Sequence, residues 1–436
     1  MVRTAALALL GAALVAGAFA VGDLGDLRLE SRAYVALQGA MLAVCGLATM
    51  LLWRGGRRRD LVVVIAVAVA ARAVLAFDAP TLSDDAYRFA WDGRVALEGV
   101  NPFRYAPADP ELRPLRDFEV FVNVNRPFVN TIYPPTYQAV FAAANVAGGD
   151  GVGPIKLAFL AAEGGLVALL LVLLARTGRP AGRVVLYAWH PLAVLETASS
   201  AHPEALLMLL VLAALLLWDR GRPARAGVAL GAAVLTKFVP LVLAPMLARR
   251  LRWRFALAGA ATMALLYLPY LPAGRELFSA FGTYADESFG AGPYAWLAGT
   301  GVPEAAARGL PLAALAAAIA WTAARPPRDL AGAARASGLL LGGVLLASHN
   351  VAPWYGLWLL PFLCVAPVGG LLWLSATLPI YYLTVISNPV LEPDGVRLVV
   401  WGPAVLLLAL EAVRSWGPAG ARARAAGEAA RARAGA

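Results

Sequence analysis

Long uncharged apolar runs constrain this chain more than any other feature of its sequence. Residues 4–22 and 33–53 are two examples, and runs of about 18 residues or more recur along the chain. An apolar stretch of that length is what a helix needs to cross the hydrocarbon core of a bilayer. The chain is 60% hydrophobic with a mean hydropathy of +0.68, which is too apolar for a soluble protein of 436 residues. The sequence therefore predicts an all-α, polytopic integral membrane protein.

Arginine clusters between the apolar runs predict how the chain is threaded. The positive-inside rule places such connections, for example Arg57–Arg59, in the cytoplasm. The net charge of +10 is carried by these clusters, so it indicates contact with anionic membrane lipid and not with nucleic acid. With Met1 inside, alternation predicts a helical bundle of about 12 spans, near residues 4–22, 33–53, 61–77, 154–176, 183–198, 204–218, 255–272, 306–324, 334–348, 353–367, 369–386 and 398–415.

Two segments do not fit simple alternation. Residues 136–148 are apolar but short, and both their ends must stay outside, so we expect a helix that lies in the outer interface or re-enters. The run 227–247 has arginine on both flanks, at Arg225 and Arg249. We expect two half-crossings that meet at residues 236–240, because interrupted helices are tolerated in membranes where they line a polar cavity.

The longest polar interval runs from Phe77 to Phe141, and residues 77–153 are predicted to be a large first external loop. It opens with two adjacent carboxylates, Asp84 and Asp85, and residues 84–98 are expected to form a short juxtamembrane helix. A carboxylate held near a dry, apolar site can act as the base for a sugar hydroxyl, since burial raises the pKa of at least one member of such a pair. We therefore interpret the pair as catalytic.

A purely structural interpretation of the same pair stays open. Asp84 and Asp85 would then only stabilise the first turn of the helix and form ion pairs with Arg88, which follows at helical spacing.

Several cations are candidates for binding a phosphate. Arg104 and Arg126 lie in the polar loop, and a guanidinium binds phosphate oxygens in a bidentate manner. Lys237 lies inside an apolar run, where a lysine is costly and marks a functional site by default. His349 lies where two predicted spans meet outside. The alternatives are loop packing for the arginines, and extension of the lysine to the membrane interface.

Further polar and aromatic residues are predicted on the same external side. With three histidines and no His-Glu-x-x-His motif, we expect no metal site. We expect the following residues to line a substrate cavity: Tyr87, Tyr133, His202, Glu204, Asn350 and Trp354.

These motifs together resemble those of a known family. The chain contains SDDAYRFAWDG, EGVNPFRYAP and TIYPPTYQAVF in the loop, and later AHPE, LTKFVP and HNVAPWY. This pattern is similar to bacterial GT-C fold glycosyltransferases, in particular to the polyprenyl-phosphate-mannose-dependent group around glycosyltransferase family 87. The resemblance covers roughly residues 60–400.

The resemblance implies an inverting transferase in the cell membrane, with its active site on the external side. The donor would be a polyprenyl-phosphate sugar, with mannose expected, and the acceptor a glycolipid or glycan; no cofactor is expected. The first loop acid, Asp84, would be the general base, with Asp85 the neighbour that stays open. Lys237 and His349 would hold the phosphate.

The expected domains are N-terminal membrane helices in residues 1–60, a GT-C-like catalytic domain in 61–415 and a disordered basic cytoplasmic tail in 416–436. Three spans precede the acidic loop, where many GT-C proteins have one, so the first 60 residues have no assigned role. A membrane transporter or lipid flippase is the alternative function, since such proteins also contain interrupted helices and buried charge.

Overall fold

A computed structural model describes residues 2–285, 292–385 and 393–416, and the regular secondary structure in these ranges is entirely helical. The prediction of an all-α fold is confirmed. The predicted tail at 416–436 lies outside the described residues beyond Trp416. In chain order the α-helices and 3₁₀ helices (η) are α1 (Val2–Gly22), α2 (Ser31–Leu52), α3 (Arg58–Leu75), α4 (Asp85–Leu97), η1 (Pro110–Leu115), η2 (Phe121–Asn123), α5 (Pro135–Gly148), α6 (Val152–Arg176), η3 (Ala181–Val184), α7 (Val185–Ala188), α8 (Pro191–Ala198), α9 (Glu204–Asp219), α10 (Pro223–Val234), η4 (Val239–Leu243), α11 (Ala244–Tyr267), η5 (Leu268–Phe278), α12 (Ser279–Ala285), α13 (Pro293–Gly299), α14 (Glu304–Ala324), α15 (Leu330–Ala347), η6 (Pro353–Trp358), α16 (Leu360–Val365), α17 (Gly369–Thr377), η7 (Leu378–Tyr381), α18 (Tyr382–Val385) and α19 (Pro393–Trp416).

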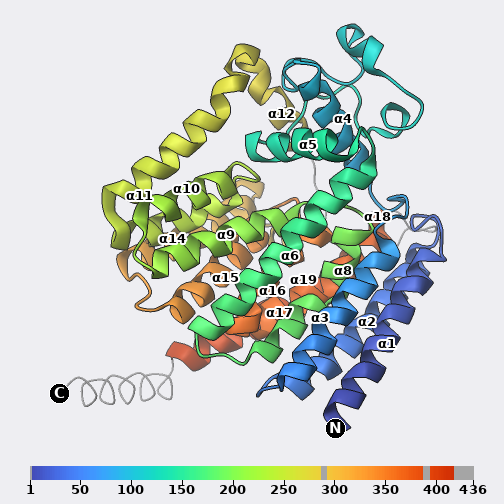
Figure 1. Cartoon of the computed structure of the whole chain (residues 1–436). Coiled ribbons are helices and arrows are strands. Elements are labelled where there is room, and N and C mark those ends of the chain that lie inside the picture. The colour runs from blue at the N-terminus through green and yellow to red at the C-terminus, as the bar shows by residue number, and fades with distance from the viewer. Residues whose placement is uncertain (1, 286–291, 386–392, 417–436) are drawn as a thin grey trace.

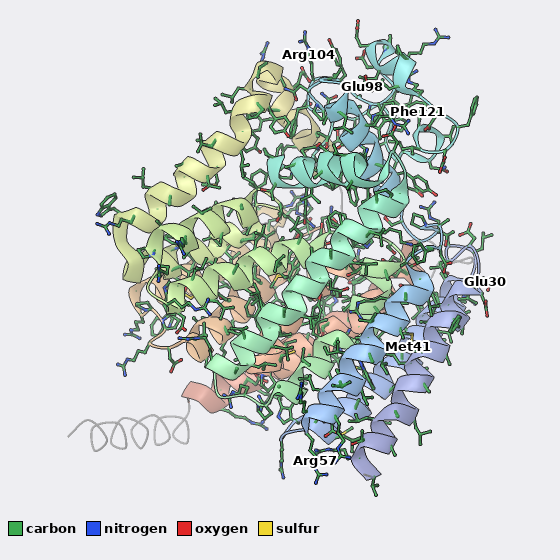
Figure 2. The ribbon with its side chains drawn as sticks, in the orientation of Figure 1. Glu30, Met41, Arg57, Glu98, Arg104 and Phe121 are labelled. Carbon is green, nitrogen blue, oxygen red and sulfur yellow. The ribbon has the colours of Figure 1, made fainter. Side chains whose placement is uncertain are left out.

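The helices form a bundle with a polar cap at one end (Figure 1). α4, α5 and the connection between them cover this end, here called the loop face, whereas α1 begins at the opposite end. Figure 2 shows Arg104 on the loop face and Arg57 at the opposite end, with Met41 of α2 between them. The arginine-rich connection after α2 and the polar loop therefore lie at opposite ends of the bundle, as the predicted threading requires.

Seven helices in the described part of the chain are long and apolar enough to cross a membrane, and they make the chain a multi-pass membrane protein. They are α1, α2, α6, the segment Trp253–Tyr284, α14, α15 and the segment Asp394–Arg414 of α19. The other predicted spans correspond to shorter or more polar helices, such as α3 and α9.

Three of those other predicted spans are divided. Residues 183–198 are shared among η3, α7 and α8, residues 353–367 between η6 and α16, and residues 369–386, as far as they are described, among α17, η7 and α18. Proline stands at the first or second position of α8, α16 and η7. Because proline lacks a backbone donor and disfavours helix at the residue before it, it favours a break in the helix at these places. The three predicted spans are therefore each built from shorter helices.

α4 and α5 form the base of the loop cap, and they confirm the helices predicted at residues 84–98 and 136–148 to within one residue at each end. They pack closely at Gly93, where an added Cβ would lie 2.6 Å from the carbonyl oxygen of Phe141. Phe89, Phe141 and Phe159 surround this contact, with ring centroids 4.8 to 6.3 Å apart. Phe159 belongs to α6, so the cap is attached to a membrane-crossing helix.

We expect Gly93→Ala to lower the stability of the purified protein by about 1–3 kcal/mol, because the new methyl group must push α4 away from α5. Gly164→Ala on the exposed side of α6 is the control, since an added Cβ there meets nothing within 4 Å. Thermal unfolding of both variants in the same detergent measures the difference. Equal melting temperatures would contradict the close packing of α4 on α5.

The apolar run 227–247 is interrupted where the sequence predicts an interruption. α10 ends at Val234 and η4 begins only at Val239, so residues 235–238 lie between two helical elements. Lys237 stands in this gap.

The segment after α11 reaches the loop face. η5 and α12 extend from the bundle toward the polar cap (Figure 1). Phe103 of the loop forms a small buried cluster with Ala273 and Leu277, and Asn101 Nδ2 donates to the carbonyl oxygen of Tyr270 at 2.9 Å. The loop cap is therefore held from two sides. On one side α4 and α5 pack on α6, and on the other the loop contacts η5.

Candidate active site

A cavity of about 480 Å³ lies beneath the polar cap. Its walls come from distant parts of the chain: the start of α4, the loop before α5, the start of α9, the gap after α10, α12, the end of α15 and η6. The charged side chains among its lining residues are Asp85, Arg126, Glu204 and Lys237. Both charge signs thus meet in one chamber whose remaining walls are largely aromatic and apolar.

The structure separates the two adjacent carboxylates of the loop. Asp85 is the first residue of α4 and lines the cavity, and its Oδ1 accepts a hydrogen bond from Asn125 Nδ2 at 2.6 Å. Asp84 occupies the N-cap position of the same helix without a side-chain capping hydrogen bond; it is not among the cavity lining and forms an ion pair with Arg28 of the α1–α2 connection. Consecutive residues at a helix start point in different directions, so one acid faces the chamber and the other faces the N-terminal helices.

The predicted alternative partner, Arg88, does not bind either acid of the pair. Its Nε donates to Asp92 Oδ1 at 2.9 Å, one turn further along α4, and both side chains are almost fully buried. Asp92 also accepts from Thr131 Oγ1 at 2.5 Å and from Gln138 Nε2 at 3.1 Å. This network ties α4 to the loop and to α5, and it leaves Asp85 available to the cavity.

His202 lies directly behind Asp85. It belongs to the connection between α8 and α9 and is fully buried. Its Nδ1 donates to Glu196 Oε2 at 2.8 Å, and its Nε2 lies 3.9 Å from Asp85 Oδ2. The ring stacks on Trp354 with centroids 3.8 Å apart and planes within 16°.

The ionisation of His202 follows from its neighbours. Burial alone would lower its pKa, but the hydrogen bond and negative charge of Glu196, with the charges of Asp85 and Glu204, raise the pKa above its ordinary value. The imidazole is therefore biased toward its cationic form despite its burial.

Lys237 and Glu204 form the second charged pair of the chamber. Lys237 Nζ donates to Glu204 Oε1 at 2.8 Å and lies 4.0 Å from the ring centroid of Tyr355. Glu204, at the start of α9, is fully buried, and its Oε2 makes no hydrogen bond within the described structure. A phosphate that binds Lys237 therefore approaches a cation whose position is already set by a buried acid and an aromatic face.

Backbone strain is concentrated at this site. Among the described residues, Arg126 (φ 47°) and Ala201 (φ 58°) are the non-glycine residues with positive φ. Such conformations are costly for a side chain with a Cβ and persist where the surroundings enforce them, often at functional sites. Arg126 lines the cavity and Ala201 precedes His202, so both strained residues orient side chains of the chamber.

The structure brings together most, but not all, of the predicted site residues. Asp85, Arg126, Tyr133, Glu204, Lys237, Asn350 and Trp354 line the cavity, and His202 lies behind it. Four predicted residues are not among its lining residues: Asp84, Tyr87, Arg104 and His349. Arg104 is exposed on the loop, against the ring of Tyr105 at 5.3 Å.

Sequence reasoning missed Glu196 and Asn125, which contact the central residues of the site. Glu196 carried a usable signal, because an ionisable residue inside an apolar run is a functional candidate by default. Asn125 carried none, since an asparagine in a polar loop is ordinary. In the described part of the chain no group of three His, Cys, Asp or Glu side chains is placed to hold a metal ion.

A bundle of apolar helices carries a polar cap, and the chamber beneath this cap holds a carboxylate and cations; this is the arrangement that the resemblance to membrane glycosyltransferases led us to expect. The chain belongs to the MptA_B family: the family model described as "Alpha-(1->6)-mannopyranosyltransferase, N-terminal domain" matches residues 3–252. The protein is thus a mannosyltransferase, and the predicted resemblance is confirmed. Comparison with curated proteins and with solved structures found no match.

The matched region contains Asp85, His202, Glu204 and Lys237 and ends within α11. The aromatic wall that includes Trp354 lies after it.

Proposed function

We propose that this protein transfers mannose from a polyprenyl-phosphate donor to a hydroxyl of a glycolipid or glycan acceptor, with inversion and with Asp85 as the general base. The observation that carries the proposal is the single cavity in which Asp85 and Lys237 meet. The proposal assigns the base to Asp85 and not to Asp84, because Asp84 is engaged by Arg28 outside the chamber.

The reaction needs a base for the acceptor hydroxyl, cations that stabilise the leaving phosphate, and a site that orients donor and acceptor. Asp85 takes the proton of the acceptor hydroxyl as its oxygen forms a bond to the anomeric carbon. The bond from that carbon to the phosphate oxygen breaks on the opposite face, and the electron pair leaves with the lipid phosphate. Lys237 and Arg126 are placed to offset the charge that this phosphate gains.

The loop face is proposed to be the external face of the cell membrane. The support is the arginine-rich connection at the opposite end of the bundle, since such connections remain in the cytoplasm (Figure 2). Seven helices in the described ranges have the length and composition of spans. We propose that the shorter and divided helices complete about 12 crossings; every residue of α8 and of α16 is buried in the bundle, so these two helices need not face lipid.

The test is transfer by the purified protein in lipid vesicles. We expect mannose transfer from a mannosyl polyprenyl phosphate to a mannose-containing glycolipid or oligosaccharide, and none from a nucleotide-linked mannose. Product analysis by NMR should show an anomeric configuration opposite to that of the donor. Transfer from the nucleotide sugar alone, or a product with the donor's configuration, would contradict the proposal.

A further inference from the structure

We infer that Glu196 is a positioning residue, which holds His202 where it stabilises the negative charge of Asp85. In this arrangement Glu196 holds His202 as a fixed cation beside the carboxylate of the base. The inference rests on the proposed function, because it concerns the residue assigned there as base.

Hydrogen-bond donors surround the buried carboxylate of Glu196. It lies in α8 with no exposed surface, where an unsolvated carboxylate would be strongly unfavourable. Three donors replace its water: His202 Nδ1 at 2.8 Å, the Tyr382 hydroxyl at 3.0 Å and the Tyr34 hydroxyl at 3.5 Å. These hydrogen bonds stabilise negative charge on the carboxylate, and that charge favours a positive charge on the imidazole that it contacts.

The helices before the acidic loop contribute to this arrangement. Tyr34 belongs to α2, and its hydroxyl also accepts from Gln38 Nε2 at 3.2 Å. Arg28 of the α1–α2 connection binds Asp84. The family resemblance left the first 60 residues without a role. In the structure they contact Glu196, which holds His202, and Asp84, which precedes Asp85 at the start of α4.

His202 has little freedom to adopt another orientation. Stacking on Trp354 sets the plane of its ring, and the hydrogen bond to Glu196 sets the rotation within that plane. Its backbone N–H donates to the carbonyl oxygen of Glu196 at 2.8 Å. The remaining ring atom, Nε2, is buried, makes no hydrogen bond within the described structure, and faces Asp85 Oδ2 at 3.9 Å.

The charges around His202 determine the direction of its effect. Three acids face it, namely Asp85 from α4, Glu196 from α8 and Glu204 from α9, and Lys237 is paired with the last of these. A cation 3.9 Å from Asp85 Oδ2 attracts the negative charge of the carboxylate and opposes the effect of the surrounding apolar walls. Without that cation, the negative charge of Asp85 loses this stabilisation.

The experiment is the pH profile of kcat/KM for mannose transfer in vesicles, comparing wild type with Glu196→Gln and His202→Gln. The low-pH limb of this profile reports the base of the free enzyme. Either change removes the cation beside Asp85, so we expect the low-pH limb of each variant to move to higher pH, with a roughly tenfold loss of activity below the limb and partial recovery above it. The donor KM should stay within about twofold.

Glu163→Gln is the matched control. Glu163 is another buried carboxylate, held by Arg72 at 2.6 Å and by the Tyr187 hydroxyl at 3.1 Å, and it does not line the cavity. Its replacement should lower stability without moving the pH limb. If Glu196→Gln does not fold, His202→Gln alone decides the question.

Two outcomes are distinguishable. An unmoved limb in a folded Glu196 or His202 variant would overturn this inference while the proposed function stands. Full activity of Asp85→Asn at all pH values would overturn the assignment of the base itself.

Discussion

Asp85→Asn should reduce mannose transfer by at least about 10²-fold, because an amide cannot take the proton of the acceptor hydroxyl. The loss should appear in kcat and not in the donor KM, since asparagine has nearly the same shape and still hydrogen-bonds Asn125. Initial rates in vesicles at saturating donor, with the amount of folded protein matched by gel filtration, measure the effect.

Asp84→Asn is the control next to it in the chain. Its carboxylate binds Arg28 and does not line the cavity, so the neutral amide should retain at least about half of the wild-type rate. The opposite order of the two activities would return the base to the first acid of the motif, as the family resemblance implied. Wild-type activity in both variants would mean that neither acid is the base.

Lys237→Met should abolish transfer and also destabilise the protein. The substitution leaves the fully buried Glu204 carboxylate without its partner, and breaking such a pair costs about 3–5 kcal/mol. We expect a value near the lower end, about 3 kcal/mol, because the Lys237 side chain is 27% exposed and partly solvated. Thermal unfolding in detergent measures the loss of stability.

The double variant Lys237→Met with Glu204→Gln separates stability from catalysis. Removing both charges should restore most of the melting temperature, because no unpaired charge remains buried. Transfer should remain at least about 10²-fold below wild type, because the clamp for the leaving phosphate is still missing. If transfer recovers together with stability, Lys237 has a structural role and does not act on the phosphate.

Local features of the chain were predictable to the extent that local physics decides them. The helix α4 follows from the acids in its first turn. The interruption that contains Lys237 follows from the arginines on both flanks of the apolar run, and the apolar spans follow from their composition. The divided segments show where this reasoning failed. Apolar composition predicted spans there but not their division into shorter helices, which the prolines at the starts of α8, α16 and η7 favour.

The candidate site was predictable in part. Lys237 and Asp85 were found because a charge in or beside an apolar run needs a reason. The choice between Asp84 and Asp85 was not available from the sequence, since it depends on which acid meets Arg28, a residue more than 50 positions away. His349 was expected to bind phosphate, whereas Asn350, its neighbour, is the one that lines the cavity.

By itself the sequence determined that this protein is a multi-pass helical membrane protein with a polar loop rich in functional groups, because hydropathy and charge act over one helix length. The tertiary structure alone decided which groups share a chamber. Contacts such as Tyr34 with Glu196, and Lys237 with Tyr355, join segments separated by more than 100 residues. They arise from how the helices pack, and packing depends on shape complementarity across the whole bundle, which no local pattern in the chain encodes.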